Sequence, residues 1–221
     1  MSEPSDSLPP HDALLLLSFG GPEGPEEVRP FLEHVTRGRG VPEARLLEVE
    51  ERYQAFGGRS PIHEHARALL AGIRQALTMR GPQLPVYFAN RHSAPFLAET
   101  IAEMARDGIQ RALCFATSAF GSHSGCRSYL EAIEEARSEV GEFAPIIEKS
   151  RLFYNHPGFI EPMTERVEQA LEKVPAQRRG SARLAFTAHS IPLSMEEVCP
   201  YVDQLEEACR LVAEAAGKKE W

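Results

Sequence analysis

Short apolar runs alternate along this chain with longer stretches whose apolar residues recur at helical spacing. Residues 13–19, 84–89, 112–117 and 183–188 are near-continuous apolar runs, which is typical of strands buried on both faces of a parallel sheet. Residues 145–154 form a weaker strand candidate. This alternation predicts an α/β fold with a doubly wound parallel sheet.

Four amphipathic helices are predicted beside these strands. Their apolar stripes lie at residues 62–77, 97–104, 160–174 and 202–216. Ser60 and Pro61 fit a helix start, and Gly108 fits a helix end. Ser194 with Glu197 is a capping-box pattern ahead of the last helix.

The chain divides into three predicted parts. Residues 1–11 carry acids and prolines, and we expect a disordered lead-in. Residues 12–150 form a first α/β half, and residues 151–221 form an incomplete second half. The second half contains one predicted strand, whereas a parallel sheet needs a further strand after the final helix.

Charge, hydropathy and cysteine content argue against a nucleic-acid-binding, membrane-spanning or secreted protein. Lys and Arg number 24 against 32 Asp and Glu, a net charge of -8, which disfavours nucleic acid and anionic membranes. The longest apolar run, residues 13–17, is far short of the ~20 that span a bilayer. No basic leader precedes it, and the four cysteines form no close pair. We therefore expect a cytoplasmic protein with free thiols and no transmembrane segment.

Polar residues follow each predicted strand, where open α/β sheets bind ligands. His92 follows the second strand, Ser122 and His123 follow the third, and His189 follows residues 183–188. A neutral imidazole at position 189 could bind a metal or accept a proton. The alternative for His189 is a hydrogen-bonded structural histidine, and the alternatives for His92 and His123 are surface or core roles.

Other patterns argue against particular chemistries. The glycines after the first strand do not form a dinucleotide fingerprint, and no zinc-protease motif occurs. Ser122 lacks the context of a hydrolase nucleophile. His63 and His65 are two positions apart, so we interpret both as solvated. Arg37 and Arg52 are positive positions that could hold carboxylates or belong to an ordinary surface.

Several segments together resemble the ferrochelatase family, most closely its bacterial, coproporphyrin-using branch. They are residues 16–22 (LLSFGGP), 34–39 (HVTRGR), 52–61 (RYQAFGGRSP) and 187–192 (TAHSIP). The resemblance implies two Rossmann-like halves, the first complete and the second partial. It implies a lyase that inserts ferrous iron into coproporphyrin III or protoporphyrin IX in haem biosynthesis.

The resemblance also implies residue roles. His189 matches the metal-site and catalytic histidine, and the porphyrin pocket would include Phe19, Arg37, Arg52, Tyr53, Ser60 and Tyr129. His92, Ser122 and His123 are further cleft candidates. Fe²⁺ is implied as substrate, with the porphyrin as small-molecule partner and no tightly bound cofactor.

The chain departs from the family pattern at several points. Phe19 stands where a metal-facing tyrosine is common, and Thr36 stands where an arginine is frequent. Family members continue past Trp221 with the glutamate that partners the histidine. Cys126 matches one ligand of the iron–sulfur cluster that some relatives hold, but the other ligands would lie further on, so we expect no cluster. Two alternatives remain: a non-catalytic tetrapyrrole-binding protein, or a chelatase for cobalt or nickel.

Overall fold

The computed structural model describes residues 11–122, 126–191 and 199–221. The chain forms two compact units. Unit 1 comprises Met1–Thr117 and Leu130–Ser150, and unit 2 comprises Ser118–Tyr129 and Arg151–Trp221. His123 and the Ser194–Glu197 capping box lie outside the described residues.

Unit 1 is built on a four-stranded, all-parallel sheet with the strand order β2-β1-β3-β4. The strands are β1 (Ala13–Ser18), β2 (Val86–Asn90), β3 (Arg111–Ala116) and β4 (Ile146–Lys149). The apolar runs that predicted these four strands are confirmed, and so is the α/β class. Since β1 and β2 run parallel, the loops that follow them leave the same edge of the sheet.

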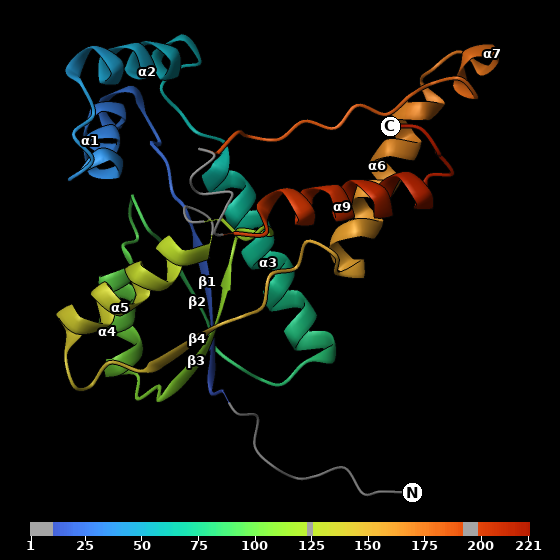
Figure 1. The fold of residues 1–221 in the computed structure, drawn as a ribbon. Helices are drawn as coiled ribbons and strands as arrows, with labels where there is room; N and C mark the ends of the chain where they lie inside the picture. The colour runs from blue at the N-terminus through green and yellow to red at the C-terminus, as the bar shows by residue number, and fades with distance from the viewer. Residues whose placement is uncertain (1–10, 123–125, 192–198) are drawn as a thin grey trace, which may run out of the picture. The chain divides into compact units, whose positions relative to one another are not determined.

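Helices cover the two faces of this sheet unequally. Figure 1 shows α4 (Leu97–Arg106) and α5 (Ser128–Val140) on one side and α3 (Ile62–Arg80) on the other. One face of the sheet is closed, because Leu15, Leu17 and Cys114 have no exposed surface. On the opposite face Leu16 is fully buried, whereas Leu14 and Phe88 are only half-buried. This face is therefore covered less completely than the first.

Two helices between β1 and β2 have no counterpart among the sequence predictions. These are α1 (Pro25–Thr36) and α2 (Glu43–Ala55). The apolar residues of α1 recur at i, i+3, i+4 and i+7, the spacing of an amphipathic helix, and Pro30 is exposed on the opposite side. Val28, Phe31 and Leu32 form a small core, against which partly buried residues of α2 pack. This core fixes α2 on α1.

Unit 2 is helical in its described part. It contains α6 (Pro157–Glu172), the short α7 (Ala176–Arg179) and α9 (Tyr201–Ala215). Ile160 of α6 meets Ala208 and Val212 of α9 in a core that partly buried aromatic residues complete. The predicted stripes of α3, α4, α6 and α9 are thus confirmed as helices.

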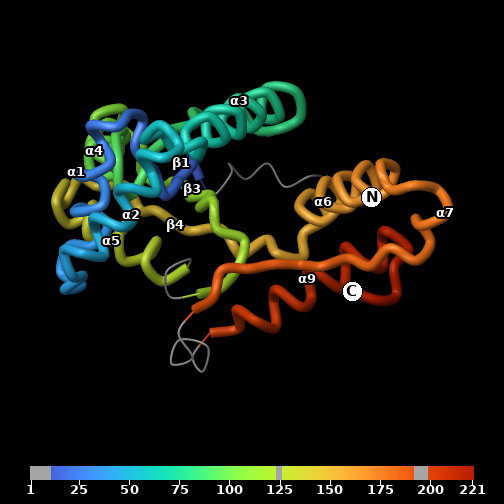
Figure 2. The backbone as a smooth tube through the Cα atoms, turned by 90° about the horizontal axis from the view of Figure 1, so that it is seen from above, coloured from blue at the N-terminus to red at the C-terminus, as the bar shows by residue number. Residues whose placement is uncertain are grey.

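The predicted strand at residues 183–188 is wrong. Residues 183–191 are extended but belong to no strand, and Figure 2 follows them as a single orange stretch. Leu184 and Phe186 are half-buried while Arg183 and Ala185 are exposed. Phe186 packs on the α6–α9 core, so this segment satisfies its apolar side chains against helices. An extended backbone becomes a strand only beside a hydrogen-bonded neighbour, and the described part of unit 2 offers none.

Two further findings bear on the remaining expectations. No described helix combines the length and apolar character needed to cross a bilayer. Cys114, Cys126, Cys199 and Cys209 all carry free thiols.

Candidate functional site

A pocket of about 500 Å³ opens in unit 1 at the carboxyl edge of the sheet. Its walls come from α1 and from the loops that follow β1 and β2, including Gly21, Pro30, Ser93 and Ala94. Open α/β sheets bind ligands in the crevice outside the carboxyl ends of their strands. The volume falls within the range of small-molecule sites.

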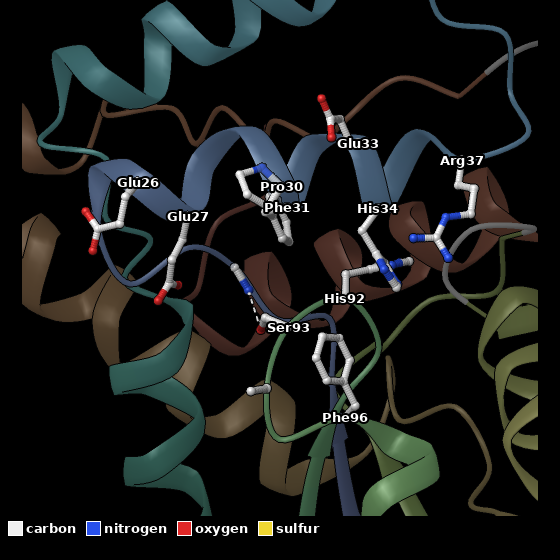
Figure 3. A pocket seen from close by; sticks show the side chains of 12 residues that line it. Glu26, Glu27, Pro30, Phe31, Glu33, His34, Arg37, His92, Ser93 and Phe96 are labelled. Carbon is white, nitrogen blue, oxygen red and sulfur yellow. Dashed lines mark hydrogen bonds between the residues drawn. The ribbon is translucent and has the colours of Figure 1, made fainter.

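The loop after β1 approaches its neighbours so closely that only glycine fits. Gly20 has φ +86°, and a Cβ there would lie 2.4 Å from Ser93 Oγ. A Cβ on Gly21 would lie 2.7 Å from the Cβ of Ser60. The Gly21 N–H donates to Ser93 Oγ at 3.1 Å, shown as the dashed line in Figure 3. The two loops are thereby held together as one wall of the pocket.

His92 lies against aromatic rings at one end of the pocket. Its ring centroid is 4.6 Å from that of Phe19 and 5.4 Å from that of His34. Both ring nitrogens are shielded from solvent, and neither has a hydrogen-bond partner among the described residues. Burial lowers the pKa of His92 to about 3, with a smaller contribution from the positive charges of Arg91, His34 and Arg39. At neutral pH this imidazole is therefore uncharged.

The two ends of the pocket differ in charge. Figure 3 shows Arg37 beside His34 and His92 at one end, and Glu26 and Glu27 at the other. Arg37 is exposed, so its guanidinium is open to an anionic group of a ligand. The arrangement suits a flat apolar ligand that carries carboxylates toward the arginine end.

The other predicted pocket residues of unit 1 have different surroundings. Phe19 is half-buried and meets Phe31 edge-on at 6.2 Å, and Tyr53 meets the same ring at 6.2 Å. Burial raises the pKa of Tyr53. Ser60 supports the β1 loop, since its N–H donates to the carbonyl of Pro22 at 2.9 Å. Arg52 is exposed and forms an ion pair with Glu48 on its own helix.

The predicted residues of unit 2 have contrasting surroundings. Tyr129 is 3% exposed and Ser122 is 8% exposed. His189 was expected at the end of a buried strand, and this placement is wrong because no strand forms there. Its side chain is exposed, and its carbonyl accepts a hydrogen bond from the hydroxyl of Tyr201 at 3.0 Å. No group of three or more His, Cys, Asp or Glu residues in the described ranges is arranged to hold a metal ion.

Sequence reasoning missed several pocket residues and misread one histidine. His34, Phe31 and Phe96 line the pocket, and an available signal for the first two was the helical spacing of the residues around them. The interpretation of His63 as solvated is wrong, because it is 4% exposed. Its Nε2 lies 2.6 Å from the carbonyl oxygen of Gly21. His65 is exposed, as expected.

Sequence comparison with known proteins points to the same family as the motifs in the loops around this pocket. The sequence model of the ferrochelatase family matches residues 11–221. The chain belongs to the ferrochelatase family. It is 50% identical over 214 residues to the ferrochelatase of Rhodopirellula baltica, covering 97% of this chain and 61% of that protein. It is 51% identical over 214 residues to the coproporphyrin III ferrochelatase of Nocardia farcinica, covering 93% of this chain and 61% of that protein.

A third relative gives the same picture. The coproporphyrin III ferrochelatase of Streptomyces coelicolor is 47% identical over 223 residues, covering 95% of this chain and 60% of that protein. The chain thus spans about three fifths of the length of these relatives. Within the ferrochelatase family, the parallel sheet of unit 1 and the helices around it form part of a Rossmann-like chelatase fold.

Proposed function

We propose that this chain binds a porphyrin and serves the insertion of ferrous iron into it during haem synthesis. Coproporphyrin III is the proposed substrate, since two of the relatives described above carry that substrate in their names. The observation that carries the proposal is the pocket at the carboxyl ends of β1 and β2, whose aromatic end lies beside an exposed arginine.

The pocket chemistry suits one edge of a tetrapyrrole. The rings of His34, His92 and Phe96 offer apolar and aromatic surface to a flat macrocycle. Arg37 offers a planar fork of N–H donors to a propionate. Because His92 stays uncharged at neutral pH, that end of the pocket accepts an apolar ring without burying a second charge. Phe19, Arg52, Tyr53, Ser60 and Tyr129 are proposed as further substrate contacts.

Metallation requires that two pyrrole N–H groups lose their protons while their lone pairs turn toward the metal. A site that binds the bent macrocycle best lowers the barrier to this step. We assign the proton acceptor and metal guide to His189, whose exposed imidazole is open to both. His92, Ser122 and His123 remain proposed cleft residues. The four free thiols support a reducing, cytoplasmic location for this reaction.

The first experiment measures porphyrin binding. Coproporphyrin III is titrated with the 221-residue chain, and binding is followed by the shift of its Soret absorption. We expect Arg37→Ala to weaken binding about tenfold, the effect of losing one charge-assisted contact of about 1.5 kcal/mol. Arg166→Ala is the matched control, because Arg166 is an exposed arginine on α6 of unit 2. Equal affinities of the two variants would contradict the role of Arg37.

The second experiment measures insertion of ferrous iron under anaerobic conditions by the loss of porphyrin fluorescence. Insertion that falls in His189→Ala while porphyrin affinity stays unchanged supports the assignment of His189. Tight porphyrin binding without insertion would identify a non-catalytic tetrapyrrole-binding protein. Faster insertion of cobalt or nickel than of iron would identify a chelatase for another metal, since imidazole alone does not choose among these ions.

A further inference from the structure

His63 is a buried titratable side chain that the proposed chemistry does not use. It is the second residue of α3, is 4% exposed, and does not line the pocket. Its Nε2 lies 2.6 Å from the carbonyl oxygen of Gly21. A carbonyl oxygen only accepts hydrogen bonds, so this nitrogen carries the hydrogen. A buried histidine thus donates to the backbone of the loop that forms the pocket wall.

The Gly21 residue is held on both sides. Its carbonyl accepts from His63, and its N–H donates to Ser93 Oγ at 3.1 Å. The Ser93 oxygen is itself 3.5 Å from the His63 nitrogen, so the three groups form one compact cluster. This cluster ties the first turn of α3 to the loops after β1 and β2.

A second contact joins the same helix to the same loop. Arg67, one turn after His63 on α3, forms an ion pair with Glu23. Arg67 and Glu23 are both largely exposed, whereas the His63 contact is buried. An exposed ion pair contributes little, whereas a buried carbonyl left without its donor costs considerably more. Of these two contacts from α3, the buried one at His63 therefore contributes more to holding the loop in place.

We propose that His63 is a positioning residue for tetrapyrrole binding, acting through Gly21 on the wall of the pocket. This inference rests on the proposed function, because it takes the pocket to be the porphyrin site. His63 fixes the peptide of Gly21 while that residue faces the ligand. Loss of the donor lets this peptide turn and disturbs the surface that receives the macrocycle.

Three variants test the role by coproporphyrin III affinity. His63→Leu removes the donor at similar volume and is expected to raise Kd about tenfold, because the loosened loop around Gly21 must then be ordered on binding. His63→Gln returns an amide N–H to the place of Nε2 and is expected to restore Kd to within about twofold. His65→Leu, an exposed histidine on the same helix, is the control. Equal affinity in His63→Leu and His65→Leu, or no rescue by Gln, overturns the proposal.

A second measurement needs no porphyrin. Nitrogen-15 NMR of the histidine rings should show hydrogen on Nε2 of His63. Exchange of the amide hydrogens of Gly20, Gly21, Glu23 and Gly24 should be faster in His63→Leu alone. Hydrogen on Nδ1, or unchanged exchange, overturns the role of His63. If the unmodified chain binds no coproporphyrin III, the proposed function fails, while the ring hydrogen and the exchange rates still decide whether His63 holds the wall.

Discussion

Strand β1 and the stretch at residues 183–188 are both predicted as strands, but only β1 forms one. Both are apolar runs followed by small or polar residues, and both were predicted as buried strands. Strand β1 pairs with β2 and β3, and Leu15, Leu16 and Leu17 lose all exposure. Residues 183–188 lie extended beside helices, with exposed and half-buried side chains in alternation. A short apolar run therefore favours an extended backbone, but it becomes a strand only where a neighbouring strand is available to pair with it.

The largest expected difference between these regions is in amide hydrogen exchange. Residues 14–17 pair with β2 on one side and with β3 on the other. Their amide hydrogens should therefore exchange only when the sheet itself unfolds. Amides of residues 184–188 should exchange at least about a thousandfold faster, a gap of roughly 4 kcal/mol in opening free energy. Exchange by mass spectrometry on peptides covering each region measures this. Similar protection would mean that the second stretch does form a ladder.

The next largest difference is expected in the free energy of unfolding when an apolar side chain is shortened in each region. Leu15→Ala empties a fully buried position and should lower the free energy of unfolding by about 2–5 kcal/mol. Leu184→Ala trims a half-buried side chain and should cost about 1 kcal/mol or less. Urea unfolding of each variant, monitored in each unit by amide hydrogen exchange, measures both changes in the free energy of unfolding. A loss at Leu184 as large as that at Leu15 would break the comparison.

The glycine loop after β1 provides a third contrast. Gly21→Ala places a methyl group against Ser60 and should lower stability by about 1–3 kcal/mol while weakening coproporphyrin III binding. Gly180→Ala in unit 2 adds its methyl group where no atom lies within 4 Å and φ is -62°, so it should be neutral or slightly stabilising. Unfolding midpoints and porphyrin titrations of both variants would test this. Full affinity in Gly21→Ala would argue against a tight wall.

A pH dependence is expected for unit 1. The unfolded imidazole of His92 takes up a proton near its ordinary pKa of 6.5, whereas in the folded protein its pKa is lowered to about 3. Protonation therefore favours the unfolded state, and the stability of unit 1 should decline as pH falls from 6.5 toward 3. His92→Phe should flatten this decline, while His65→Gln should leave it unchanged. Urea midpoints at pH 7.5 and 5.0 provide the measurement, and an identical slope in His92→Phe would contradict the assignment.

Prediction from sequence succeeded where a local pattern and its tertiary setting agree. The stripes of α3 and α4 became helices, and the strands β1 to β4 lie close to their predicted ranges. Helix α1 was not predicted, although Val28, Phe31, Leu32 and Val35 have helical spacing and Phe31 lines the pocket. His63 was misread because residue spacing gives a helix face but does not say what packs on that face.

The amino-acid sequence by itself determined the parallel α/β sheet, the polar loops at its carboxyl edge and membership of the ferrochelatase family. These follow from local periodicity and from motifs, which need no knowledge of distant contacts. Only the tertiary structure decided that residues 183–188 form no strand, that His189 is exposed, and that His63 is buried behind Gly21. Pairing and burial depend on residues far apart in the chain, and local patterns do not encode those partners.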